Sequence, residues 1–239
     1  MTHVNQIEIL DQNLRNISRP NRLPALLNVG LTGSIGSGKS TLAAQLQGAG
    51  ALMIDFDAIS HQLTGANGAA MPEIVAAFGA AMQLPDGALH RSNMRQLVFH
   101  DGDAKRLLEK IMHRLISQHA ILQAAQLVDA QPNALCVVYD IPLLYGNTRW
   151  LDLLDAIVCV TCERTTQISR VLQRSPQLTV QMVERILAQQ ASNYELRSIA
   201  NVVFDNTQNA ANHLQNKGSL NILLEYITRL TQAKEHENY

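Results

Sequence analysis

The sequence has almost no net charge and few cysteines, and each shortage excludes a class of protein. Nineteen Lys and Arg residues oppose twenty Asp and Glu residues among 239, which gives a formal net charge of −1 at pH 7. So small a charge does not predict a basic surface for duplex DNA or for an anionic membrane. Three cysteines, an odd number in a chain of this length, do not predict a disulfide framework.

Long apolar runs are also missing. No charge-free stretch approaches the ~20 apolar residues that span a bilayer. Residues 1–24 are polar, with scattered Asp, Glu and Arg, and are not expected to be a secretory signal. We therefore expect a cytoplasmic protein in which residues 1–24 form a flexible extension. The chain is 46% hydrophobic, and its remainder is expected to fold around an apolar core.

The histidines and cysteines do not form a zinc motif. The eight His residues show no H-x-x-x-H or H-E-x-x-H spacing, so catalytic zinc is not supported. Cys159 and Cys162 have C-x-x-C spacing, but residues three apart on a strand face opposite sides of the sheet. No second C-x-x-C is present to complete four ligands, so both cysteines are expected to lie in the core.

After residue 24, short apolar runs alternate with segments of helical periodicity. The runs expected to be buried strands are residues 25–31, 51–54, 135–139, 156–160 and 202–204. The spacing of apolar residues predicts mostly helix over 58–128, further helices over 164–174 and 180–194, and a last helix at the C-terminal end. This alternation predicts an α/β fold with a parallel five-stranded sheet between two layers of helices.

The strongest functional signal lies between the first expected strand and the helix after it. Residues 33–40 read Gly-Ser-Ile-Gly-Ser-Gly-Lys-Ser and fit the phosphate-binding motif G-x-x-x-x-G-K-[ST]. The glycines let backbone N–H groups point at phosphate oxygens, and the helix N-terminus adds more of them. Lys39 is expected to reach the β- and γ-phosphates of ATP, and the Ser40 hydroxyl to ligate Mg²⁺. The predicted nucleotide-binding residues are Gly33, Ser34, Ile35, Gly36, Ser37, Gly38, Lys39, Ser40 and Thr41.

Carboxylates follow two other expected strands. Asp140 follows the run at 135–139 and has the form of a Walker B acid that holds Mg²⁺; a helix-capping or turn role is the alternative. Asp55 and Asp57 follow the run at 51–54, at the edge of the sheet where α/β proteins bind ligands. Either one of them orients or deprotonates an attacking hydroxyl, or both are solvated turn residues.

Paired arginines supply candidate cations. Arg170 and Arg174 lie four residues apart on the expected helix that ends before Ser175. The interruption of the helical pattern there suggests the tip of a lid. Arg91 and Arg95 have the same spacing and are candidates for gripping substrate phosphates. Phosphoryl transfer needs positive charge beside the migrating group, although each arginine is equally suited to a solvated helix surface.

Taken together, these segments resemble the dephospho-coenzyme A kinase family over about Leu27 to Asn206. The resemblance rests on residues 31–41, 54–60, 86–91, 94–95, 98–99, 112–113 and 140–144, and on Gln190, Glu195, Arg197, Asp205 and Asn206. The reaction that it implies moves the γ-phosphoryl group of ATP to the ribose 3′-hydroxyl of dephospho-coenzyme A, with Mg²⁺.

The resemblance also implies roles for individual residues. Asp57 matches the family's proposed base, with Lys39 and Arg174 as further catalytic residues. The implied substrate-binding residues are Asp55, Asp57, Arg91, Arg95, His113, Pro142 and Leu143. The implied partner is this small-molecule substrate, with neither nucleic acid nor membrane, and the expected state is a monomer.

A domain division follows from the same resemblance. The core is expected to combine residues 25–57, 130–163 and 198–232, like the core of the nucleoside monophosphate kinases. Residues 58–129 are expected to form a helical coenzyme A-binding domain, and residues 164–197 a lid.

The sequence also departs from the family pattern. Gly146, Ser175 and Asn201 stand where the family has acids, and Arg114 stands where it has Pro. These differences keep two alternatives open: a kinase of another small acceptor, such as a nucleoside monophosphate, or a catalytically weak nucleotide-binding regulatory protein.

Overall fold

A computed structural model describes residues 7–10, 23–207 and 213–237 and contains a six-stranded sheet in the order β1-β6-β5-β2-β4-β3. The strands are β1 (Ile7–Ile9), β2 (Asn28–Gly33), β3 (Leu52–Asp55), β4 (Val137–Asp140), β5 (Ala156–Thr161) and β6 (Val202–Asp205). β2 pairs in parallel with β4 and β5, and β5 pairs in parallel with β6. The predicted α/β class is confirmed, with a sheet that is mostly parallel.

The sheet has one strand more than predicted. Ile7–Ile9 pair antiparallel with β6, with Ile7 opposite Phe204, so the expectation of a flexible extension is wrong for these residues. Ile7 is buried, and Glu8 forms an ion pair with Arg197. The open edge of β6 offers unpaired backbone groups that a short segment satisfies. Of the expected extension, residues 1–6 and 11–22 lie outside the described residues.

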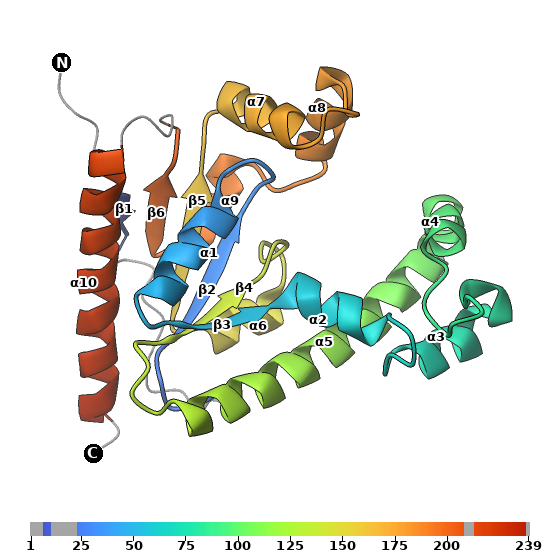
Figure 1. Cartoon of the computed structure of the whole chain (residues 1–239), viewed down its shortest axis with the longest axis horizontal. Coiled ribbons are helices and arrows are strands. Elements are labelled where there is room, and N and C mark those ends of the chain that lie inside the picture. The colour runs from blue at the N-terminus through green and yellow to red at the C-terminus, as the bar shows by residue number, and fades with distance from the viewer. Residues whose placement is uncertain (1–6, 11–22, 208–212, 238–239) are drawn as a thin grey trace. The chain divides into compact units, whose positions relative to one another are not determined.

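Helices alternate with the strands along the chain (Figure 1). They are α1 (Lys39–Gly48), α2 (Phe56–Leu63), α3 (Met71–Phe78), α4 (Arg91–His100), α5 (Gly102–Ala130), α6 (Thr148–Leu153), α7 (Arg164–Arg174), α8 (Val180–Ala188), α9 (Asn193–Ile199) and α10 (His213–Glu237), with a 3₁₀ turn, η2 (Ala80–Met82). No helix in the part of the chain that the structure describes is both long and apolar enough to cross a membrane.

The helix expected over 180–194 is wrong in its extent, because the structure divides that segment into α8 and α9. Ser192 caps α9 by accepting a hydrogen bond from the Glu195 N–H, while the Glu195 carboxylate accepts from the Ser192 N–H and hydroxyl. These hydrogen bonds lower the pKa of Glu195. The reciprocal capping box starts a new helix and leaves residues 189–192 as a connection.

The chain forms two compact units, and the first, residues 1–54 and 124–239, contains the sheet. Alternate side chains of its strands face opposite helices. One face, including Leu31 and Val158, packs against α1 and α10 through residues such as Leu46 and Ile227. On the other face, Cys159 and Val203 pack with residues of α9. The strands are thus buried on both sides, as parallel sheets require.

The second unit, residues 55–123, contains α2, α3, η2, α4 and most of α5. It is helical, with an isolated antiparallel bridge between Gln83 and Leu89. Arg114 of α5 binds the Glu73 carboxylate of α3 at 2.5 and 2.6 Å. The arginine that replaces the family's Pro therefore joins two helices of this unit.

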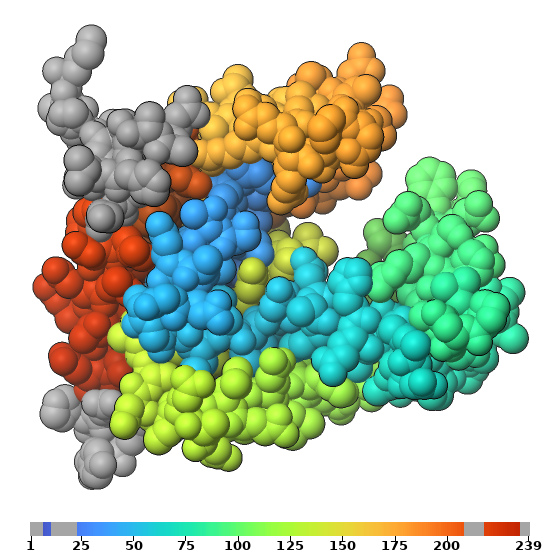
Figure 2. Space-filling view, viewed as in Figure 1, coloured from blue at the N-terminus to red at the C-terminus, as the bar shows by residue number. Residues whose placement is uncertain are grey.

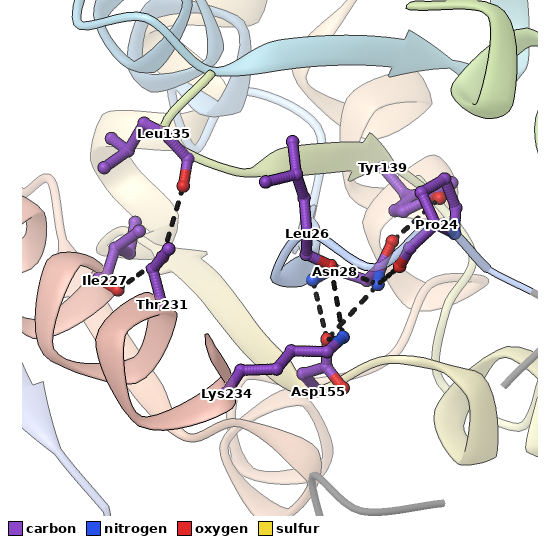
Figure 3. A network of polar contacts seen from close by, with 9 residues as sticks. All are labelled: Pro24, Leu26, Asn28, Leu135, Tyr139, Asp155, Ile227, Thr231 and Lys234. Atoms are coloured by element: carbon purple, nitrogen blue, oxygen red, sulfur yellow. Dashed lines mark hydrogen bonds and ion pairs between the residues drawn. The ribbon is translucent and has the colours of Figure 1, made fainter. Parts of the chain in front are cut away.

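A buried polar network lies at the end of the sheet where β2 begins (Figure 3). Lys234 Nζ of α10 lies 2.5 Å from Asp155 Oδ2 and donates to the Leu26 carbonyl at 3.1 Å. The same carboxylate oxygen accepts the Asn28 backbone N–H at 2.7 Å, and the Tyr139 hydroxyl donates to Asn28 Oδ1 at 3.1 Å. Burial, and then the charge of Asp155, raise the pKa of Tyr139. This network fastens α10 to the strands.

Candidate nucleotide-binding site

The phosphate loop, residues 33–40, connects β2 to α1, and the path of its backbone requires glycine. A Cβ at Gly33 would lie 2.6 Å from the Val160 carbonyl oxygen and 2.8 Å from Ser37 Oγ. Gly36 and Gly38 have φ angles of +76° and +92°, which side chains other than glycine rarely adopt. The loop thus lies close against β5 and turns twice through left-handed backbone.

The N-terminus of α1 leaves backbone donors open. Gly38 caps the helix without a side chain, and its carbonyl accepts the first helical hydrogen bonds, from Thr41 N at 3.0 Å and Leu42 N at 3.2 Å. Among the described residues, no protein group accepts a hydrogen bond from the N–H of Gly36, Gly38, Lys39 or Ser40. Such a group of unpaired amides at a helix N-terminus is suited to bind an anion.

Two side chains beside these amides carry opposite charge. Lys39 Nζ forms an ion pair with Asp140 Oδ1, and the two side chains are 17% and 13% exposed. Asp140 ends β4 directly opposite Leu31 of β2, so parallel pairing brings the carboxylate to the strand that leads into the phosphate loop. The structure thus brings together the predicted cation and the predicted Walker B acid.

Hydroxyl groups complete this edge. Ser40 is exposed at the start of α1. The Ser37 hydroxyl is buried inside the loop and has no hydrogen-bond partner in the described structure. Thr32 and Asn201 each have such a buried polar atom in the described structure as well, so this feature alone does not mark a ligand site.

The carbonyl groups of the loop face α7 and the residue after β6. Arg170 Nη1 lies 3.5 Å from the carbonyl oxygens of Gly36 and Ser37, and Nη2 donates to the Asn206 carbonyl at 2.9 Å. Asn206 Nδ2 donates to the Ser37 carbonyl at 2.8 Å and fills the space where Gly38 lacks a side chain. The space-filling view shows the blue surface of this region beneath the orange surface of α7 (Figure 2).

The two arginines of α7 have different surroundings. Arg170 is half-buried against the phosphate loop, as described above, so its guanidinium holds the backbone. Arg174 is the last residue of α7 and is exposed. The connection from Ser175 to Thr179 follows it, and Thr179 caps α8. Of this pair, Arg174 is therefore the one whose charge lies open to solvent or to a ligand.

Asp55 and Asp57 differ in the same way. Asp55 is the N-cap of α2, and its Oδ1 accepts the Ala58 N–H at 2.9 Å. Asp57 lies in the first turn of α2, is exposed, and pairs with no side chain in the described residues. Both side chains are exposed, and the cap hydrogen bond distinguishes Asp55 from Asp57.

The remaining predicted substrate-binding residues lie in both units. In the second unit, the Arg91 guanidinium contacts His61 Nδ1 at 3.0 Å and Thr64 Oγ1 at 3.2 Å. Arg95 and His113 are exposed on α4 and α5. Pro142 and Leu143 belong to the first unit and follow β4, where Leu143 is 67% exposed.

Both residues of the C-x-x-C segment lie in the core, as expected. Cys159 is buried between strand and helix, and burial raises its pKa to about 12. Cys162 is also buried, and its Sγ lies 3.4 Å from Arg170 Nη1. Burial raises the pKa of Cys162 as well. Cys159 belongs to β5, whereas Cys162 follows the end of that strand.

The residues where family acids are absent have ordinary structural surroundings. Gly146 has a φ of +81° and open space around it. Ser175 is the C-cap of α7. Asn201 is fully buried, and its Oδ1 accepts the Ile157 N–H at 2.8 Å, so the amide supplies a hydrogen-bond acceptor between β5 and β6 without a negative charge.

Comparisons with known proteins identify one family. The family model described as Dephospho-CoA kinase matches residues 27–212. The dephospho-CoA kinase of Ralstonia nicotianae is 41% identical over 211 residues, which cover 86% of this chain and 97% of that protein. The dephospho-CoA kinase of Albidiferax ferrireducens is 42% identical over 181 residues, 76% of this chain and 84% of that protein.

Solved structures show the same fold. A protein from Thermus thermophilus aligns with a TM-score of 0.68 and 28% identity, over 84% of this chain and 96% of that one. A dephospho-CoA kinase from Campylobacter jejuni aligns with a TM-score of 0.60 and 22% identity, over 84% of this chain and 97% of that one.

Proposed function

The chain belongs to the dephospho-CoA kinase family, and from this premise we propose that it transfers the γ-phosphoryl group of ATP to the ribose 3′-hydroxyl of dephospho-CoA. The products are coenzyme A and ADP. The single observation that supports this most directly is the set of open amides at the start of α1 beside the Lys39–Asp140 pair. Phosphoryl transfer depends mainly on positioning and on charge stabilisation, which such an arrangement supplies.

In this proposal the phosphate loop binds the triphosphate of ATP. The N–H groups of Gly36, Gly38, Lys39 and Ser40 donate to phosphate oxygens, and the Lys39 ammonium moves from Asp140 to the phosphates. Charge that develops on the transferred group is thereby met by donors already in place. Asp140, released from Lys39, becomes available as an oxygen ligand.

The residues at this edge suit Mg²⁺. The Ser40 hydroxyl and the Asp140 carboxylate are oxygen donors of the kind that Mg²⁺ prefers, and they would hold the ion together with phosphate oxygens. When bound, the ion would neutralise charge on the β- and γ-phosphates. Removal of Mg²⁺ with a chelator is expected to abolish transfer and to be reversed by added Mg²⁺.

We propose Asp57 as the group that receives the proton of the attacking hydroxyl. Its carboxylate is exposed, whereas that of Asp55 caps α2. In a loose transition state the base mainly orients the hydroxyl and takes the proton late, which a carboxylate of ordinary acidity can do. Asp55 is proposed to keep the start of α2, and hence Asp57, in place.

The remaining assignments belong to the same proposal. Residues 58–129 would form the domain that binds the acceptor, with Arg91, Arg95 and His113 near its phosphates, and Pro142 and Leu143 would contact it from the first unit. Residues 164–197 would form the lid, with Arg174 as its cation. The enzyme is proposed to act as a monomer in the cytoplasm, where neither nucleic acid nor membrane is a partner.

A coupled assay of ADP release tests the function directly. The wild-type protein, supplied with Mg²⁺ and ATP, is expected to turn over dephospho-CoA and to form a product with the mass of coenzyme A. A preference for AMP or UMP would indicate a kinase of another acceptor. ATP binding without transfer to any acceptor would indicate a regulatory nucleotide-binding protein. The comparisons favour neither alternative.

Substitution of the two aspartates of α2 tests the proposed base. Asp57→Asn is expected to lower kcat about 10²-fold with little change in the KM of either substrate. The matched control is Asp55→Asn, which keeps an oxygen to cap the helix and is expected to lower kcat far less. Wild-type turnover in Asp57→Asn would assign the base to another residue.

A further inference from the structure

Two glutamines hold one residue of the phosphate loop through its two backbone polar groups, which belong to successive peptide units. The Ile35 N–H donates to Gln190 Oε1 at 2.9 Å, and Gln167 Nε2 donates to the Ile35 carbonyl at 3.2 Å. Gln190 lies in the connection between α8 and α9, and Gln167 lies on α7. One amide therefore acts as an acceptor and the other as a donor toward the same residue.

Gln167 and Gln190, with their two hydrogen bonds to Ile35, form a clamp. Neighbouring contacts show that this clamp is closely packed. Gln167 is 5% exposed, so its side-chain amide has little access to water. A Cβ at Gly36 would lie 2.7 Å from the Gln167 carbonyl oxygen, so the backbone of α7 lies directly against the loop. The Ser34 hydroxyl adds a contact to the Ala191 carbonyl at 3.3 Å.

The clamped residue immediately precedes the open amides. Ile35 is followed by Gly36, whose N–H is the first of the donors described above. Gly36 adopts positive φ, and rotation of the Ile35–Gly36 peptide would change where that N–H points. Donors stabilise a charged ligand most when they are oriented before it arrives, because the reorientation then costs nothing on binding.

We propose that Gln167 and Gln190 are positioning residues for ATP, which act through the backbone of Ile35 to orient the phosphate loop before the nucleotide binds. Gln167 holds the Ile35–Gly36 peptide, and Gln190 holds the peptide before it. This inference rests on the proposed function only in naming ATP as the ligand. Because both glutamines lie in the segment 164–197, the same contacts join that segment to the phosphate loop. Neither residue touches the nucleotide in this account.

Replacement of each glutamine by glutamate separates the two hydrogen bonds. Gln190→Glu keeps the oxygen that accepts the Ile35 N–H, whereas Gln167→Glu places a carboxylate against the Ile35 carbonyl and removes the donor. Both variants add one carboxylate beside the same residue, at a buried position for Gln167 and at a half-buried position for Gln190. Their comparison therefore needs a variant that removes the Gln167 donor without adding a charge.

The measurements are the dissociation constant of ADP with Mg²⁺ by calorimetry, the KM for each substrate, kcat, and the melting temperature. Gln190→Glu is expected to weaken ADP binding and raise the KM for ATP about threefold, through charge repulsion. Gln167→Glu is expected to do so about thirtyfold, because a buried acceptor is also left opposite a carboxylate. The KM for dephospho-CoA is expected to change less than twofold in both.

Two further variants keep the test decisive. Gln189→Glu adds the same charge one residue from Gln190, on an exposed side chain outside the clamp, and is expected to change ADP binding by less than twofold. Gln167→Met removes the donor without adding a charge and is expected to raise the KM for ATP about tenfold, should Gln167→Glu fail to fold.

Three results would overturn the proposal. Equal weakening in Gln167→Glu and Gln190→Glu would show that only charge matters. Wild-type ADP binding in Gln167→Met would show that the clamp does not orient the loop. A lower melting temperature with unchanged ADP binding would show a merely structural role. Since ADP binding needs no acceptor, each result is readable even if dephospho-CoA is not the substrate.

Discussion

Two Lys–Asp pairs lie at opposite ends of the parallel sheet, and their surroundings differ. At the end where β2 begins, Lys234 and Asp155 are 10% and 6% exposed, and backbone and side-chain groups satisfy both charges. At the end where β2 leads into α1, Lys39 and Asp140 are 17% and 13% exposed and adjoin amides without protein partners. The same pair of residue types thus has backbone partners at one end and lies beside unpaired amides of the described loop at the other.

The difference shows that an ion pair alone says little about function. A buried pair contributes little net stability but is costly to break, because the remaining charge loses its partner. Around Lys234 and Asp155, the Asn28 N–H donates to the carboxylate and the Leu26 carbonyl accepts from the ammonium, as Figure 3 shows. Lys39 and Asp140 lie beside donors that a polyanion can occupy, and a ligand can therefore replace their mutual contact.

The largest effect is expected from Lys39→Met. Removal of the cation from the phosphate loop should lower kcat about 10³-fold, because charge on the transferred group loses its stabilisation. The melting temperature should fall less than in a Lys234→Met variant, since Lys39 and Asp140 are the more exposed of the two pairs. Steady-state assay and thermal melting measure the two effects. Lys105→Ala, at an exposed position, is the control. Substantial activity in Lys39→Met would contradict the proposed role of Lys39 in stabilising the transferred phosphoryl group.

Lys234→Met should show the opposite pattern. It leaves the buried Asp155 carboxylate without its cation, which costs about 3 kcal/mol of unfolding free energy. Chemical denaturation measures that loss. Below the unfolding transition, kcat should remain within about twofold of wild type, because Lys234 lies at the opposite end of the sheet from the proposed site. A large loss of kcat in protein shown to be folded would remove the distinction between the two ends.

Asp140→Asn is expected to have an intermediate effect on catalysis. The amide is a poorer ligand for Mg²⁺ than the carboxylate, so kcat should fall about 10²-fold and half-maximal activity should require more Mg²⁺. A titration of Mg²⁺ at saturating ATP measures both. An unchanged Mg²⁺ requirement would argue that Asp140 serves only as the partner of Lys39.

Tyr139→Phe should have the smallest effect. The Tyr139 hydroxyl donates to Asn28 Oδ1 in the buried network, and its loss leaves one acceptor unpaired. We expect a loss of about 1 kcal/mol in unfolding free energy and no change in the KM for ATP. Denaturation curves give the first value. A change in KM for ATP would show that the two ends of the sheet are coupled.

The sequence predicts the loop well because its chemistry is local. The motif at 33–40 depends on glycine at fixed positions and on a strand and a helix that each have a clear apolar pattern, and the structure contains all of these. Parallel strands then bring Asp140 to the same edge without further information. The expected helix over 164–174 coincides with α7 for the same reason, since Ile168, Val171 and Leu172 recur at helical spacing.

The features that were missed depend on contacts distant in sequence. Ile7–Ile9 is too short for a strand pattern and becomes one only beside β6. Gln167 is an ordinary helix residue until the fold places its amide on Ile35. The break between α8 and α9 is different, because the S-x-x-E spacing of Ser192 and Glu195 is a local capping signal that was available in the sequence.

A crystal structure of the protein with Mg²⁺ and a non-hydrolysable ATP analogue tests the central claim most directly. We expect phosphate oxygens within hydrogen-bond distance of the amides of Gly36, Gly38, Lys39 and Ser40. Lys39 Nζ should contact the phosphates and no longer contact Asp140. Lys234 should keep its contact with Asp155. An analogue bound elsewhere, or bound phosphates with the Lys39–Asp140 pair still intact, would contradict it.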